Sequence, residues 1–207
     1  MTKVNNNTTK PTKKYRTILA DPPWSKNQKG NYGACHHYDL MSLERIKGMP
    51  VADLTEDNAH CYLWVTNSNV EEGYDVLRAW GFEPKSVIVW FKFYLGLGSN
   101  FRNTTEQLLF GVKGKLPLKT KCEPNTIITT RLKHSEKPDE QFAKIERCSN
   151  GDYLELFARR KRHGWDSWGN EVTSDVVIPG YPVPRYSSKA LADYELAKKS
   201  LAESEVA

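Results

Sequence analysis

Residues 15–27 read YRTILADPPWSKN, a short apolar run that stops abruptly. The apolar run predicts a buried β-strand. Pro22 and Pro23 then remove two backbone donors and fix two φ angles, so neither a strand nor a helix continues through them. A rigid turn after a strand is a common structural arrangement. Here it would also fix the Asp21 carboxylate, the Pro22 carbonyl and the Trp24 ring, so that all three can face one ligand.

The rest of the chain alternates between strand-like and helix-like segments. Strands are predicted over residues 15–20, 59–66, 86–93, 106–112, 125–130 and 151–158, and helices over residues 42–54, 68–80 and 138–148. Ser68 and Glu71 have the spacing of a capping box at the start of the second helix. Strands separated by helix-length segments predict an α/β fold, with a mostly parallel sheet and helices on both faces. Ligands in such folds bind beyond the carboxyl ends of the strands.

Composition divides the 207 residues into a domain with two tails. Residues 1–14 are polar and basic and predict a flexible tail, residues 15–171 carry the α/β pattern, and residues 172–207 form a C-terminal appendage. The four cysteines form no CxxC pair, which favours a reducing compartment. No stretch has the length of a membrane span or the pattern of a signal peptide. We therefore expect a cytoplasmic protein without a membrane partner.

Basic residues gather in three clusters within a chain of net charge +5. They lie in residues 3–14, 113–121 and 159–163. A single cluster is as readily explained by a solvated surface. Three clusters together favour a polyanionic partner, and nucleic acid before any other.

The residues of the turn suit the methylation of an exocyclic amine on a nucleobase. Such a nitrogen is a poor nucleophile, because its lone pair is delocalised into the ring. If the Asp21 carboxylate accepts one N–H and the Pro22 carbonyl accepts the other, the lone pair is directed at an electrophile. Trp24 would give an extruded base a face on which to stack, and Pro23 would keep the turn rigid.

The chain resembles the adenine-N6 methyltransferases with a DPPW signature, the MT-A family, which includes the eukaryotic messenger-RNA adenosine methyltransferase and many bacterial and phage enzymes. The resemblance spans residues 15–171 and rests on motifs in a fixed order. After DPPW these are HYDLMSLERI (37–46), YLWVTN (62–67), AWGFE (79–83), GLGSNFRNTTEQLLFGVKG (96–114), HSEKPDEQFAKIERCS (134–149), ELFAR (155–159) and GWDSWGNE (164–171). Each later motif is weak alone, but their joint order is specific.

This resemblance implies a Rossmann-like sheet that binds S-adenosylmethionine as co-substrate. It implies that Asp21 touches both the target amine and the amino-acid end of the donor, and that Lys137 meets the donor carboxylate. The donor would be lined at the last strand by Glu155, Leu156 and Arg159, and its adenosine part held by Asn170 and Glu171. Residues 160–163 differ from the messenger-RNA enzyme, so the residue among them that reaches the donor is left open.

On the substrate side, the resemblance places Tyr38 near the target base. Arg102 and Glu106 would organise the glycine-containing loop before the 106–112 strand, with a plain ion pair as the alternative. Cys35, His36 and His37, with His60 and Cys61, have the side chains of metal ligands, but their spacing fits no zinc pattern. We therefore expect no metal.

The expected activity is methyl transfer from S-adenosylmethionine to adenine N6 in a polynucleotide. Asp at the first position of the tetrapeptide favours adenine over cytosine or glutamine. DNA is favoured over RNA, because the chain is compact and carries no RNA-binding module. The same reaction on RNA is one alternative, and a catalytically idle nucleic-acid-binding partner of an active methyltransferase is another. No target-recognition domain is visible, which leaves a homodimer or a methyltransferase-like partner open.

Overall fold

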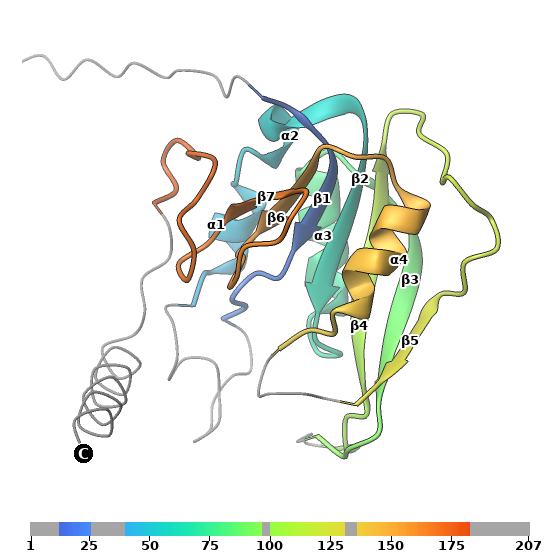
Figure 1. Cartoon of the computed structure of the whole chain (residues 1–207). Coiled ribbons are helices and arrows are strands. Elements are labelled where there is room, and N and C mark those ends of the chain that lie inside the picture. Colours follow the sequence, from blue (N-terminus) through green and yellow to red (C-terminus); the bar gives the residue numbers. More distant parts are fainter. Residues whose placement is uncertain (1–12, 26–39, 97–99, 131–135, 183–207) are drawn as a thin grey trace, which may run out of the picture.

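The computed structural model describes residues 13–25, 40–96, 100–130 and 136–182 (Figure 1). Within them one sheet has the strand order β5-β3-β4-β2-β1-β6-β7. Its strands are β1 (Tyr15–Ala20), β2 (Thr55–Val65), β3 (Glu83–Lys92), β4 (Thr105–Lys113), β5 (Thr126–Thr129), β6 (Tyr153–Leu156) and β7 (Trp165–Trp168). β4 runs antiparallel to its neighbours β2 and β3, and the other adjacent pairs are parallel. The predicted α/β fold with a mostly parallel sheet is confirmed.

Helices cover both faces of this sheet (Figure 1). α1 (Leu43–Lys47), α2 (Val51–Leu54) and α3 (Val70–Ala79) pack on one face, and α4 (Glu140–Cys148) packs on the other. Successive strand residues therefore enter different cores: Ile18 of β1 packs with the first three helices, and Leu19 packs with α4. Burial on both faces explains why the central strands are apolar throughout rather than alternating.

The N-termini of α1 and α3 differ in whether a side chain caps the helix. Ser42 caps α1, because its side-chain oxygen accepts a hydrogen bond from the Arg45 N–H, and Pro50 separates α1 from α2 within the helical segment predicted over 42–54. The capping box predicted at Ser68 is wrong, because α3 begins one residue later and its N-cap is Asn69. The Asn69 side chain makes no cap bond and instead accepts a hydrogen bond from the Thr66 hydroxyl at 2.6 Å.

The described part of the predicted C-terminal appendage packs on the domain. Ile178 is 2% exposed, and Val176 and Tyr181 lie against the core that contains α1. The Tyr181 ring also faces the Arg45 guanidinium, 5.3 Å from the ring centroid. Residues 183–207, and the predicted tail up to residue 12, lie outside the described residues. None of the helices described here is both long enough and apolar enough to cross a membrane.

Candidate active site

The Asp21–Trp24 turn follows β1 directly and is held by hydrogen bonds from several directions. The Trp24 N–H donates to the Pro22 carbonyl at 2.9 Å, and the Met41 N–H donates to the Pro23 carbonyl at 2.9 Å. The Trp24 indole Nε1 donates to the Trp64 carbonyl of β2 at 3.0 Å. The turn is therefore fixed both to the neighbouring strand and to the segment before α1.

Trp24 does not occupy the position expected of a stacking face. Its side chain is 4% exposed and lies in the core beneath α1, so both faces of its ring are packed. In this arrangement Trp24 anchors the turn, and its predicted stacking role towards a base stays a prediction. The Pro22 carbonyl accepts one hydrogen bond from Trp24 and keeps a second lone pair, so its predicted role towards an amine stays a prediction.

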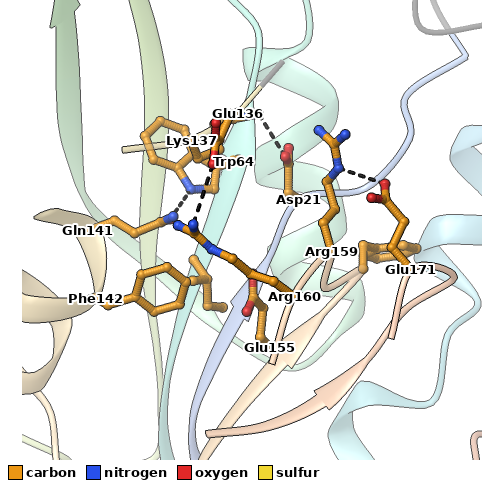
Figure 2. Close-up of a pocket in the computed structure, with 12 residues that line it drawn as sticks. Asp21, Trp64, Glu136, Lys137, Gln141, Phe142, Glu155, Arg159, Arg160 and Glu171 are labelled. Atoms are coloured by element: carbon orange, nitrogen blue, oxygen red, sulfur yellow. Dashed lines mark hydrogen bonds and ion pairs between the residues drawn. The ribbon is translucent and has the colours of Figure 1, made fainter. Parts of the chain in front are cut away.

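A cavity of about 230 Å³ opens beside Asp21, between the carboxyl ends of β1 and β6 and the start of α4 (Figure 2). Its lining is Leu19, Asp21, Trp64, Glu136, Lys137, Gln141, Phe142, Glu155, Phe157, Arg159, Arg160 and Glu171. Five of the seven residues predicted to bind the donor are therefore brought together around one space: Asp21, Lys137, Glu155, Arg159 and Glu171.

The other two predicted donor residues lie differently. The Leu156 side chain is fully buried in the core beneath α1 to α3, on the sheet face opposite the cavity. Leu156 does not line this cavity, and its predicted place beside the donor stays a prediction. Asn170 does not line the cavity, and its buried Nδ2 has no hydrogen-bond partner among the described residues. A buried donor of this kind is costly to leave unpaired, which suits a group that waits for a ligand.

Asp21 pairs with Lys137, whose ammonium lies 2.7 Å from its Oδ2. Burial raises the pKa of Asp21, and the Lys137 ammonium acts against that rise. Lys137 Nζ also lies 3.5 Å from Glu106 Oε2, and Lys92 Nζ lies 2.7 Å from Glu106 Oε1. Burial acts to raise the pKa of Glu106, but Lys137 and Lys92 outweigh it and the pKa falls below its ordinary value.

Glu155 faces the cavity from β6 (Figure 2). Burial raises its pKa to about 7, and the nearby Asp21 carboxylate adds to the rise, while Arg162 and Arg160 oppose it. A carboxyl with this pKa changes charge near neutral pH. The cavity thus holds one paired carboxylate at Asp21 and one carboxyl at Glu155 whose charge depends on conditions.

The far side of the cavity depends on a close approach between the ends of β6 and β7. The Ala158 N–H donates to the Trp168 carbonyl at 2.9 Å, and a Cβ placed on Gly169 would lie 2.0 Å from the Ala158 oxygen. Only glycine fits at that distance. Arg159 and Glu171 follow these two strand ends, and Arg159 Nε donates a hydrogen bond to Glu171 Oε1 at 2.7 Å. Both side chains therefore line the cavity as an ion pair (Figure 2).

Of the residues left open over 160–163, Arg160 is the one that lines the cavity. Lys161 pairs with Asp175, and Arg162 pairs with Asp139 while it packs over the Phe142 ring. The basic run is therefore largely paired with carboxylates and offers less free positive charge than its sequence suggests.

Sequence reasoning missed the apolar and amide lining of the cavity. Trp64 Nε1 donates to Gln141 Oε1 at 2.6 Å, and the Lys137 ammonium lies 5.5 Å from the Trp64 ring centroid. Strand alternation carried the missing signal, since Leu19 and Trp64 enter the α4 core. Because Leu19 and Trp64 stand at the ends of β1 and β2 on the sheet face that α4 covers, they border a cavity beneath α4.

The remaining predicted residues are either outside the described part of the chain or absent from the cavity lining. Tyr38 is outside the described residues, as are Cys35, His36 and His37. Arg102 is exposed in the segment between β3 and β4, and the two ion pairs of Glu106 in the described chain are to lysines, not to Arg102.

His60 and Cys61 do not form a metal site together. Both ring nitrogens of His60 are hydrogen-bonded, one to the Ser149 hydroxyl and one to the Leu116 carbonyl, each at 2.8 Å. Cys61 points into the core on the other sheet face. No group of three metal-ligating side chains occurs among the described residues.

The comparison with known proteins agrees with this geometry. The family model MT-A70 matches residues 15–171. The Type II methyltransferase M.MunI of a Mycoplasma is 30% identical over 190 residues, which cover 81% of this chain and 82% of that protein. The putative N(6)-adenosine-methyltransferase MT-A70-like of Medicago truncatula is 31% identical over 77% of this chain, and the catalytic subunit METTL3 of Homo sapiens is 28% identical over 85%.

The chain spans most of the Mycoplasma protein but only 27% and 31% of the plant and human proteins. The family match extends from the first residue of β1 to Glu171 at the cavity, and so includes the turn, the sheet and the whole lining. On this evidence the chain belongs to the MT-A70 family.

Proposed function

We propose that this chain transfers a methyl group from S-adenosylmethionine to N6 of adenine in DNA. Membership of the MT-A70 family, with relatives named as N(6)-adenosine-methyltransferases, supports an S-adenosylmethionine-dependent adenine-N6 methyltransferase. The choice of DNA is the finer part of the proposal. It is supported by a match over 82% of the length of the Type II methyltransferase M.MunI.

The observation that carries the proposal is the convergence of Asp21, Lys137, Glu155 and Glu171 on one cavity. S-adenosylmethionine supplies an electrophilic methyl group on a sulfonium, together with an ammonium, a carboxylate and ribose hydroxyls. Lys137 suits the carboxylate, and Glu155 suits the cationic end. The Glu171 carboxylate suits ribose hydroxyls, as an acid at a strand end does in dinucleotide folds.

Asp21 and the Pro22 carbonyl would then hold the target amine. Each oxygen accepts one N–H, which fixes the nitrogen and directs its lone pair into the cavity. Trp24 keeps the turn in place through its bond to the Trp64 carbonyl. Lys137 at 2.7 Å favours the ionised form of Asp21, the form that accepts a hydrogen bond. The protein's contribution is thus position and charge rather than removal of a proton from a neutral amine.

The test is methyl transfer from labelled S-adenosylmethionine to matched single- and double-stranded DNA and RNA, with digestion to nucleosides. We expect N6-methyladenine in DNA with the wild-type protein and a loss of at least about a hundredfold with Asp21→Ala. Asp75→Ala is the control, because the Asp75 side chain is 50% exposed on α3 and lies 3.4 Å from Arg78 in a surface ion pair. Label in RNA alone would overturn the choice of DNA.

The same experiment separates an enzyme from a nucleic-acid-binding partner. If the chain only binds, no substrate is labelled, and Asp21→Ala keeps its affinity for the polynucleotide. We propose that sequence choice comes from a short site or from a second chain, either a copy of this one or a methyltransferase-like partner. Mass measurement on the protein with and without DNA tests that part.

A further inference from the structure

Four charged side chains form a row of alternating sign that ends at Asp21. Lys92 lies 2.7 Å from Glu106, Lys137 lies 3.5 Å from the other oxygen of Glu106, and Lys137 lies 2.7 Å from Asp21. The four come from β3, β4, the segment before α4 and the turn after β1. The Lys137 ammonium is therefore shared between two carboxylates carried by different strands.

Asp21 is the most exposed of the four side chains, and the other three are largely buried. The side chains of Lys92 and Lys137 are 12% and 14% exposed, Glu106 is 23% exposed, and Asp21 is 34% exposed. Water screens charges poorly at such depth, so a change at one member is felt at the next. Lys92 and Lys137 also lie over the Trp90 and Trp64 rings, which limits the space in which each ammonium can move.

We propose that Glu106 and Lys92 are positioning residues for methyl transfer, which hold the Lys137 ammonium between two carboxylates and so set how far it neutralises Asp21. This rests on the proposed function, because it takes Asp21 as the carboxylate that binds the target amine. Glu106 does not line the cavity and acts through Lys137. Its role is thus different from the loop-organising role that the sequence suggested.

Removing the charge of Glu106 should strengthen the Asp21–Lys137 pair. Of the two carboxylates in the row, the ammonium then keeps only Asp21, and the repulsion that Glu106 exerts on Asp21 disappears. Asp21 ionises at lower pH but is held more tightly by Lys137, in competition with the target amine.

Removing the charge of Lys92 should act in the opposite direction. Glu106 loses the cation at 2.7 Å and draws Lys137 towards itself, which leaves Asp21 less compensated. The other charged groups that face Asp21 are Glu155 on β6 and Arg159 after it, and neither changes in these variants. Opposite shifts from two neighbouring substitutions are a signature that a general loss of stability does not produce.

The direct test is the titration of the Asp21 carboxyl carbon by NMR in the full chain, assigned with Asp21→Asn. Against the wild type, we expect the pKa of Asp21 to fall by about half a unit or more in Glu106→Gln and to rise by a similar amount in Lys92→Met. The acid limb of the pH–rate profile should move in the same directions. At the pH optimum, kcat of Glu106→Gln should drop about tenfold with a smaller change in the donor KM, and Glu106→Asp should recover part of it.

Glu123→Gln is the matched control. Glu123 also accepts from two cations, Lys144 at 2.7 Å and Arg147 at 2.6 Å, but lies away from the cavity. It should lower stability and leave the titration of Asp21 unchanged.

An Asp21 titration that stays fixed in both variants, or moves the same way in both, overturns the inference. If Glu106→Gln does not fold, the direction found in Lys92→Met decides alone. The titration needs no methyl transfer, so an inactive wild type refutes the proposed function and still leaves this test intact.

Discussion

Glu155 changes its charge near neutral pH, because burial raises its pKa to about 7. The donor's methionine end carries two positive groups and one negative group, so it is attracted by an ionised Glu155. We expect donor affinity, measured by calorimetry, to rise by up to about tenfold from pH 6 to pH 8 and to be flat in Glu155→Gln. Glu44→Gln is the control, since Glu44 is 81% exposed on α1. An equal pH dependence in all three proteins would contradict the expectation.

The same carboxyl makes a signed prediction about stability. Its pKa is higher in the folded state than in the unfolded chain, so the folded state keeps a proton that the unfolded state releases. The contribution of Glu155 to the free energy of unfolding is therefore present at low pH and is lost as pH rises from about 4.5 to about 7. Urea unfolding of Glu155→Gln should show less loss across that window than the wild type does.

Substitutions of Trp24 test whether its ring stabilises the turn or offers a face on which a base can stack. Trp24→Phe keeps most of the buried ring but loses the hydrogen bond to the Trp64 carbonyl, and should cost about 1 kcal/mol of unfolding free energy. Trp24→Ala should cost about 3–5 kcal/mol, as a large buried side chain does. Urea denaturation measures both. A Trp24→Ala protein with wild-type stability and no activity would favour the stacking role instead.

At the scale of single elements, the contact between the ends of β6 and β7 sets the far wall of the cavity. Gly169→Ala would place a methyl group 2.0 Å from the Ala158 oxygen, so the two strand ends must separate. We expect a loss of about 1–3 kcal/mol in unfolding free energy and weaker donor binding through Glu171. Gly151→Ala is the matched control, because its Cβ would only touch the Tyr153 ring at 3.8 Å. Equal effects of the two substitutions would contradict this account.

The elements that the sequence predicted well are those whose signal is local or repeated. β1, the central strands and α4 were found because apolar runs and a helical period extend over several residues. β7 was not predicted as a strand, because it has only four residues and is held extended by its pairing with β6 rather than by a local sequence pattern. The prediction of a capping box was wrong because both Ser68 and Asn69 can serve as an N-cap. A spacing rule does not locate the first residue of a helix to within one position.

The candidate site was predictable to the extent that it follows strand ends. The positions of Asp21 and Arg159 follow from the rule that ligands lie beyond the carboxyl ends of parallel strands, whereas Glu155 came from the family resemblance. The burial of Trp24 and the opposite orientation of Leu156 did not follow, because each depends on which helix covers the neighbouring face. The row contains Asp21 and Lys137, which are more than a hundred positions apart in the sequence. Only the three-dimensional arrangement brings these two residues together with Lys92 and Glu106.

At the scale of the whole molecule, the basic clusters at residues 113–121 and 159–163 do not share one surface, since Arg159 and Arg160 of the second line the cavity. The backbone of Lys119 bonds to the Cys148 carbonyl at the C-terminal end of α4, and Lys113 bonds to Thr55 at the start of β2. The first cluster therefore lies where the parallel strands begin, at the opposite end of the sheet from the Asp21–Trp24 turn. Arg102 lies between β3 and β4, on the side where the parallel strands end.

This separation predicts unequal salt effects on DNA binding. Affinity should fall with salt, and Arg102→Gln should reduce the slope of log affinity against log salt by about one, as the loss of one phosphate contact does. Lys121→Gln should leave the slope unchanged, because Lys121 belongs to the cluster at the opposite end of the sheet. Fluorescence anisotropy at several salt concentrations measures both slopes. An effect of Lys121 and none of Arg102 would place the DNA at the other end of the sheet.

All six tryptophans of the chain are buried, none with more than 5% of its surface exposed, and Trp64 alone among them lines the cavity. Its ring lies under the Lys137 ammonium, a charge close enough to alter the energy of the excited indole. The fluorescence of Trp64 should therefore report on the position of the Lys137 ammonium. Native emission should be blue-shifted as a whole, and a ligand that displaces Lys137 should change the emission of one ring against five constant ones. Trp64→Phe would silence that signal and leave the unfolding signal of the others in place.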